Sequence, residues 1–155
     1  MPKPPILDPK TLEARTGTIY PPEFAGPLKG REKRALGDAF GLTQFGVNLT
    51  TLAPGAWSAQ RHWHAKEDEF VFVVEGEITL IDDAGEHLMK PGMCAGFKAG
   101  VANGHHLVNK TNSSATYLEV GTRSLDEATD YPDVDMKAKK IDGKWLLTRK
   151  DGTGF

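Results

Sequence analysis

The chain has 155 residues, of which 39% are hydrophobic and 26% are charged, and its formal net charge at pH 7 is −2. These values fit one compact domain with a hydrophobic core and argue against a disordered or fibrous polypeptide. They also argue against a nucleic-acid partner, because lysines and arginines are spread along the sequence and their densest groups contain no aromatic residues.

The first thirty or so residues are rich in proline and glycine and lack sustained hydrophobic periodicity. We expect them to form an arm rather than a domain. They lack the apolar core of a signal peptide, and no apolar stretch approaches the roughly twenty residues of a membrane span. The sequence therefore predicts a cytoplasmic protein with no membrane partner. The single cysteine, Cys94, agrees with a reducing compartment, and we expect it to be a small buried core residue.

From about Lys33 onward, short strand-like runs recur between turn signals such as Ala53-Pro54-Gly55 and Lys90-Pro91-Gly92. The predicted strands are 44–52, 57–62, 69–74, 77–81, 87–89, 94–97, 106–109 and 116–120. Their even spacing indicates an antiparallel sandwich or barrel.

The last thirty residues add two predicted elements. A short helix is expected over 124–129, where Ser124 could cap and Asp126 and Glu127 would suit the first turn. A hairpin is expected over 137–141 and 145–148, because the turn pair Asp142-Gly143 readily accepts positive φ.

The run His62-Trp63-His64, followed by Glu69, is the candidate metal motif. In an extended strand His62 and His64 point the same way, with Trp63 opposite, and Glu69 opens the next apolar run. Imidazole nitrogens with one carboxylate oxygen suit zinc, manganese, iron or nickel. We expect one divalent transition metal here, of unknown identity.

Two motifs resemble those of the cupins, which are small jelly-roll barrels that hold a metal in the barrel mouth. The first runs from Gly55 through the histidine pair and Glu69 to Gly76, with one extra residue in its first spacer. The second runs from Gly100 through His105 to Asn109, with two extra residues before the histidine. His105 is therefore the predicted fourth ligand. The usual spacing would select Asn103 instead, and a β-bulge would select His106.

The resemblance implies an all-β double-stranded β-helix (jelly-roll, cupin barrel) with an N-terminal arm and a C-terminal hairpin. We assign residues 1–43 to the arm and first strand or strands, 44–123 to the barrel core, and 124–155 to an extension that packs on the barrel. Small cupins usually pair through their sheets, so the resemblance also implies a homodimer.

Other polar residues are open to two interpretations. Glu67 and Asp68 are by default solvent-facing charges, but their nearness to the metal makes Glu67 a candidate catalytic base. Gln60 is in phase with the histidine pair, so it either lines the same pocket or hydrogen-bonds a ligand. Of the alternating residues 117–120, either Tyr117 and Glu119 or the two residues beside them face inward. His87 is expected to be exposed.

Three imidazoles and one carboxylate would leave two positions of an octahedral ion open, which suits chelation of a hydroxyl and carbonyl pair and stabilisation of an enediolate. That chemistry belongs to an aldose–ketose isomerase, and similar small cupins are described as sugar-phosphate isomerase-like. Lys66, Lys98 or Arg123 could then bind the phosphate. The alternatives are an iron-dependent dioxygenase of a small organic acid and a non-catalytic small-molecule-binding barrel.

Overall fold

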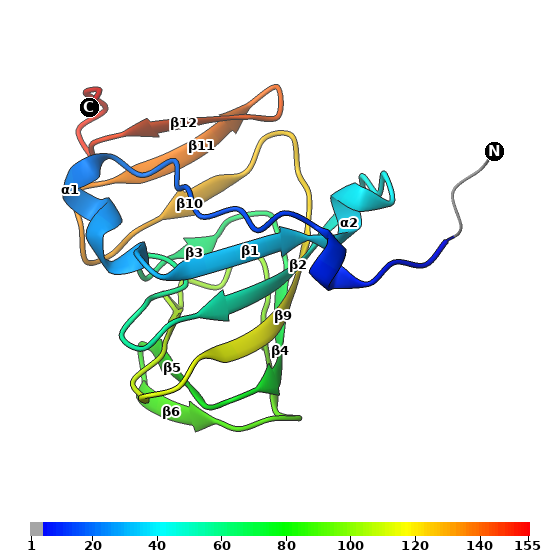
Figure 1. The fold of residues 1–155 in the computed structure, drawn as a ribbon. Helices are drawn as coiled ribbons and strands as arrows, with labels where there is room; N and C mark the ends of the chain where they lie inside the picture. The colour runs from blue at the N-terminus through cyan, green and yellow to red at the C-terminus, as the bar shows by residue number, and fades with distance from the viewer. Residues whose placement is uncertain (1–4) are drawn as a thin grey trace.

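The structure, a computed structural model, describes residues 5–155 and contains two walls of antiparallel strands (Figure 1). The first wall is a five-stranded sheet. In spatial order its strands are β1 (Arg31–Ala35), β2 (Phe45–Leu52), β9 (Ala115–Thr122), β4 (Glu69–Glu75) and β7 (Cys94–Phe97). Strands far apart in the sequence are neighbours here, as a jelly roll requires.

The second wall consists of a three-stranded and a four-stranded sheet. The three-stranded sheet has the order β6 (Gly85–Met89), β5 (Ile78–Asp82) and β8 (His106–Val108). The four-stranded sheet has the order β12 (Lys144–Thr148), β11 (Lys137–Ile141), β10 (Ala128–Asp130) and β3 (Trp63–His64). Isolated bridges from Trp57 to Val108 and from His62 to His105 join the two sheets. The predicted all-β jelly-roll fold is thus confirmed.

The hydrophobic core lies between the walls and follows the alternation of side chains along the strands. On β4, Val71 and Val73 are buried, whereas Phe70 and Phe72 between them are exposed. Opposite them, the second wall contributes Ile78 and other residues of the main core cluster. This cluster also contains Leu52, Ala56, Leu80, Met89, Leu107, Ala115 and Tyr117.

The segment before β1 contains three short helical turns, η1 (Pro9–Thr11), α1 (Pro22–Ala25) and η2 (Gly26–Leu28), and α2 (Leu36–Ala39) follows β1. No hydrophobic periodicity in the sequence predicts these turns. Tyr20 and Phe24 pack against a second core cluster, formed by Tyr131, Met136 and Ala138 of the C-terminal segment. The arm therefore packs against the C-terminal segment.

Two predicted elements are wrong. Residues 124–129 do not form a helix, because Glu127 is fully buried and its carboxylate accepts hydrogen bonds from backbone amides of residues 65 and 66, while strand β10 begins at Ala128. Residues 57–62 form only isolated bridges, and the regular strand is Trp63–His64.

Cys94 is exposed, which contradicts its predicted burial. It lies on β7, where the alternate residues Ala95 and Phe97 pack against the core, so the alternation directs Cys94 outward. The predicted C-terminal hairpin is confirmed, with φ of 51° at Asp142 and 76° at Gly143.

The motif glycine Gly76 has a steric reason for its place. Its φ is +74°, and a Cβ added there would lie 2.8 Å from the Cα of Ala115. Only glycine fits this turn between β4 and β5. In the described residues, no helix is long and apolar enough to cross a membrane.

Candidate metal centre and pocket

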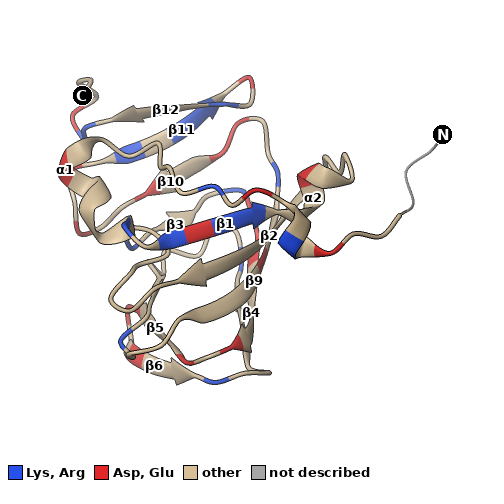
Figure 2. Ribbon diagram, in the orientation of Figure 1, with Lys and Arg blue, Asp and Glu red and all other residues tan. Residues whose placement is uncertain are grey.

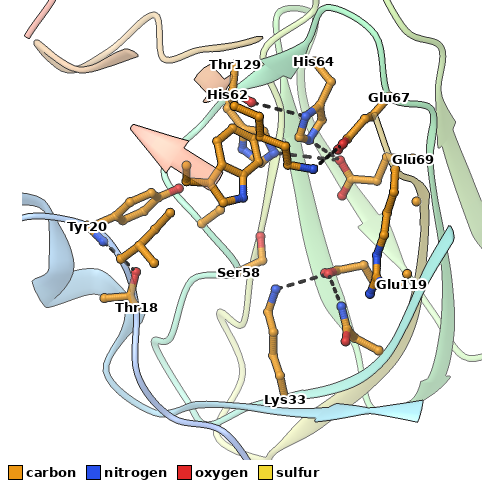
Figure 3. A pocket seen from close by; sticks show the side chains of 18 of the residues that line it. Thr18, Tyr20, Lys33, Ser58, His62, His64, Glu67, Glu69, Glu119 and Thr129 are labelled. Atoms are coloured by element: carbon orange, nitrogen blue, oxygen red, sulfur yellow. Dashed lines mark hydrogen bonds and ion pairs between the residues drawn. The ribbon is translucent and has the colours of Figure 1, made fainter. Parts of the chain in front are cut away.

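Three imidazoles, those of His62, His64 and His105, meet the carboxylate of Glu69 at the barrel mouth. Figure 3 shows His62, His64 and Glu69 of this group. The Glu69 Oε2 atom lies 3.0 Å from His105 Nε2 and 3.4 Å from His64 Nε2. It lies 3.8 Å from His62 Nε2. The start of β4 supplies the carboxylate, and the bridged segments around residues 62 and 105 bring the rings together. The four side chains that the sequence singles out as candidate ligands therefore lie together.

Backbone carbonyls orient two of the rings. The Nδ1 atom of His62 lies 2.7 Å from the Gln60 carbonyl oxygen, and that of His105 lies 3.0 Å from the Asn103 carbonyl oxygen. A carbonyl can only accept, so each neutral ring donates through Nδ1 and carries its lone pair on Nε2. The ring of His105 is also stacked on Phe97, with centroids 3.5 Å apart.

The atoms that face one another are therefore electron-pair donors. Two such donors 3.0 Å apart, as in the contact between His105 and Glu69, repel unless a proton or a metal cation lies between them. Burial raises the pKa of Glu69, but the interactions with the three adjacent imidazoles outweigh burial and hold that pKa well below its ordinary value. An anionic oxygen beside nitrogen lone pairs is the donor set that a divalent transition metal prefers. The residues present fit the metal.

The structure distinguishes His105 from its neighbour. The Nδ1 atom of His106 lies 2.9 Å from the Ala59 carbonyl oxygen, and its ring contacts Trp57 edge-on. Burial lowers the pKa of His106, which lies away from the Glu69 carboxylate on the opposite face of its strand. Asn103 bonds to Asp82 and the backbone of residue 83, outside the cluster. As expected, the fifth histidine, His87, is exposed.

A pocket of about 690 Å³ extends from this cluster along the inner face of the five-stranded sheet. His62, His64 and Glu69 line one end. Its remaining polar wall comes from the arm, from β1, β2, β9 and β10, and from the C-terminal hairpin. A pocket of this size suits a small organic substrate.

Glu67 is buried, so the default interpretation of a solvent-facing charge is wrong for it. Its Oε1 atom lies 2.6 Å from Lys140 Nζ and accepts a hydrogen bond of 2.9 Å from the Ser124 amide. Both charged side chains line the pocket, as Figure 3 shows for Glu67 beside His64. Lys140 lies on β11, 73 positions along the chain, so only the tertiary structure reveals this pair. Asp68 is exposed.

A second group of possible ligands consists of His64, Glu67 and Glu127. The carboxylate of Glu127 already accepts hydrogen bonds from the amides of Ala65, Lys66 and Ala128. The carboxylate of Glu67 is likewise engaged. This group is therefore satisfied by protein donors.

The predicted phosphate-binding residues do not meet in the pocket. Lys66 is paired with Asp126, and neither Lys66 nor Lys98 lines the pocket. Arg123 does line it, but one of its guanidinium nitrogens lies 2.7 Å from Asp38. The basic residues that sequence reasoning missed are on β1 and in the arm, where no apolar pattern marks a pocket wall.

Two open alternatives are resolved by the structure. The side chain of Gln60 donates to the Phe24 carbonyl oxygen at 2.8 Å and does not line the pocket; it is the backbone carbonyl of Gln60 that contacts a candidate ligand. Tyr117 and Glu119 face inward, Tyr117 within the core and Glu119 at the pocket wall.

Comparison with known proteins agrees with this geometry. Residues 48–121 match the model of the cupin domain. The sugar phosphate isomerase of the cupin superfamily from Silicibacter pomeroyi has 50% sequence identity and a TM-score of 0.93, covering 97% of this chain and 96% of that one. A candidate sugar phosphate isomerase from Acidithiobacillus ferrooxidans has 30% identity and a TM-score of 0.73, covering 81% and 80%.

A polyketide cyclase from Streptomyces resistomycificus, with 22% identity, a TM-score of 0.63 and coverage of 79% and 80%, shares the fold alone. No protein of curated function matches the sequence. The half-identical relative spans nearly the whole chain, and the cupin model spans both motifs. The chain belongs to the cupin superfamily.

Proposed function

We propose that the protein is a metal-dependent isomerase that interconverts the aldose and ketose forms of a small phosphorylated sugar. The observation that carries the proposal is the convergence of three imidazoles on the Glu69 carboxylate at one end of a polar pocket. The two similar cupins described as sugar phosphate isomerases support the substrate class.

In this proposal His62, His64, Glu69 and His105 hold one divalent metal. When bound, the metal would polarise the hydroxyl and carbonyl oxygens of the substrate. The carbonyl groups that orient the rings of His62 and His105 keep the Nε2 lone pairs directed at the site.

Glu67 is the proposed base. Isomerisation removes one proton from a substrate carbon, returns one to the neighbouring carbon and moves one between the two oxygens, so it consumes no oxidant. Glu67 lines the pocket beside His64 and can accept the carbon-bound proton and return it. Lys140, 2.6 Å from the Glu67 carboxylate, compensates its charge and fixes its position. Both side chains are largely buried at the pocket wall, with 12% of Lys140 and 11% of Glu67 exposed.

The first test is metal analysis of the purified protein after reconstitution, with a His64→Ala variant as control. We expect about one metal ion per chain in the unmodified protein and a much lower content in the variant. No metal in either protein would reject the proposal.

The second test follows a panel of aldose phosphates in D₂O by NMR. The proposal expects a ketose product that carries deuterium on carbon. Oxygen consumption with an iron-loaded protein would instead identify a dioxygenase. Saturable binding without turnover would identify a binding protein.

We also propose a homodimer that pairs through the outer face of the five-stranded sheet. Phe70 and Phe72 on β4 are exposed there. Their partners across the sheet are apolar in two successive rows, namely Val120 and Val47 beside Phe70, and Leu118 and Leu49 beside Phe72. A two-fold axis would bring this apolar patch onto itself, which would bury the apolar area.

Light scattering after size exclusion tests the pairing. We expect Phe72→Lys to shift the protein to a monomer. Leu88→Lys, which changes another exposed apolar residue, on β6, serves as the control and should leave the mass unchanged. A monomeric unmodified protein would contradict the pairing.

A further inference from the structure

The pocket continues well beyond the metal cluster. Its floor is the inner face of four neighbouring strands in the order β1, β2, β9 and β4. Glu69 stands on β4, while Arg31 and Lys33 stand on β1 and line the same pocket. Three strand spacings separate the two backbones by about 14 Å, and long side chains shorten the gap from both sides. Figure 3 shows Lys33 and Glu119 on the side away from His64.

Arg31 is an unusual residue at this far end. It is only 9% exposed, yet no carboxylate lies within ion-pair distance of its guanidinium among residues 5–155. Its Nη1 atom donates to the Ser58 carbonyl oxygen at 2.6 Å and its Nη2 atom to that of Gly17 at 3.1 Å. The Nε atom has no hydrogen-bond partner. A buried cation without a counterion is costly, which favours an anion beside it.

Other unpartnered groups do not offer this explanation. In the described part of the chain, two further buried side-chain atoms lack a partner, the hydroxyls of Thr50 and Tyr117. Both residues are fully buried, stand opposite each other on β2 and β9, and do not line the pocket. Arg31 is thus the member of this set that borders the cavity.

The charge around Arg31 also favours an anion. Lys33 Nζ lies 3.1 Å from Glu119 Oε1, and the Asn48 amide donates to the same oxygen at 3.1 Å. Lys33 therefore balances the charge of the Glu119 carboxylate, and the positive charge of Arg31 has no counterion at this end of the pocket among the described residues. Three of the five residues of β1 are basic, as the blue segments on this strand show (Figure 2).

We propose that Arg31 and Lys33 bind the phosphate monoester of the substrate while its other end reaches the histidine cluster. This proposal rests on the function proposed above, to which it adds the residues that select a phosphorylated ligand. The unbalanced charge of the Arg31 guanidinium and the ammonium of Lys33, which keeps N–H donors beyond its bond to Glu119, favour a phosphate from one strand. The far placement of the phosphate would orient a sugar chain along the sheet toward Glu69.

The test titrates inorganic phosphate into the metal-loaded and the metal-stripped protein by calorimetry, at constant ionic strength set with chloride. We expect saturable binding in both forms. Lys33→Met and Arg31→Lys should each weaken it by about tenfold or more, which is the range for hydrogen bonds to charged groups. Arg34→Met is the matched control, because Arg34 stands on the same strand outside the pocket, and it should bind like the unmodified protein.

Arg31 also donates to two backbone carbonyls, so its replacement could disturb the fold. Near-ultraviolet circular dichroism checks that the Arg31→Lys variant is folded. If it is not, the result for Lys33→Met decides the test. No phosphate binding, equal binding by Lys33→Met and Arg34→Met, or binding that disappears with the metal would overturn the proposal. Those results would leave an isomerase of unphosphorylated sugars intact. Phosphate binding without any isomerisation would instead reject the proposed function and keep the anion site.

Discussion

The cluster around Glu69 and the group of His64, Glu67 and Glu127 contain similar side chains, but their carboxylates have different hydrogen-bond partners. Around Glu69, the facing atoms are imidazole nitrogens, and carbonyl groups hold the other nitrogen of His62 and of His105. Within residues 5–155, no backbone amide donates to the Glu69 carboxylate. Around Glu127, three backbone amides donate hydrogen bonds to the carboxylate. A histidine-carboxylate group is therefore open to a metal only where the protein leaves its lone pairs unclaimed. Residue types alone do not separate the two clusters.

The largest effect is expected at the first cluster. Glu69→Gln replaces the anionic donor by a neutral amide of the same size, and we expect metal affinity to fall by more than about 100-fold, since even residues that only orient ligands account for 10–100-fold. Activity should be lost with it. Metal titration by competition with a chelator measures the change. Retention of full metal content would show that the carboxylate is not a ligand.

Glu67 belongs to the second cluster by position but is proposed to act on substrate. Glu67→Gln should lower kcat by about 100-fold, the lower end of the range for a general base, while metal content stays the same. A double-mutant cycle with Lys140→Met measures their coupling. An unchanged kcat would remove Glu67 from the mechanism, and a loss of metal would place it in the first cluster instead.

Glu127 should matter for folding alone. Glu127→Gln weakens charge-assisted hydrogen bonds to the amides of residues 65, 66 and 128, and we expect the free energy of unfolding to fall by about 2 kcal/mol. Urea denaturation measures this loss. The metal content per folded chain should match that of the unmodified protein, and a metal deficit would contradict the division between the clusters.

The smallest effect is expected at the contact between Thr129 and His64, the histidine that both clusters share. Thr129 Oγ1 lies 3.4 Å from His64 Nδ1, a longer contact than those of the other two rings. Thr129→Val keeps the shape and removes the hydroxyl, so metal affinity should fall by about tenfold or less. Chelator competition detects a change of this size. A loss as large as that of Glu69→Gln would mean that His64 depends on this hydroxyl for its orientation.

Much of the fold could be predicted because most of its strands have a local sequence pattern of alternating apolar residues bounded by turn residues. The alternation of β4 and β7 and the Asp142-Gly143 turn are local, and they agree with the observed elements. Strand β1 has no such signal, because four of its five residues are charged. Its outer and inner faces are set by pairing with β2, which no local pattern specifies.

The site residues also fall into two groups, those that local sequence patterns predict and those that only the tertiary structure reveals. The two histidine motifs are marked by spacing, since strand alternation and one fixed turn place the side chains. The burial of Glu67 depends on Lys140, and the role of Arg31 depends on the absence of a carboxylate around it. Both are properties of the assembled pocket, so no spacing in the sequence could reveal them.

The contact between the arm and the C-terminal segment has a consequence for biosynthesis. Arg149 is paired with Glu23, and Phe24 contacts Phe155, so elements 126 and 131 positions apart hold each other. A ribosome releases the four candidate ligands before it releases Lys140 or the hairpin. During translation the hairpin side of the pocket wall is therefore synthesised after all four candidate ligands.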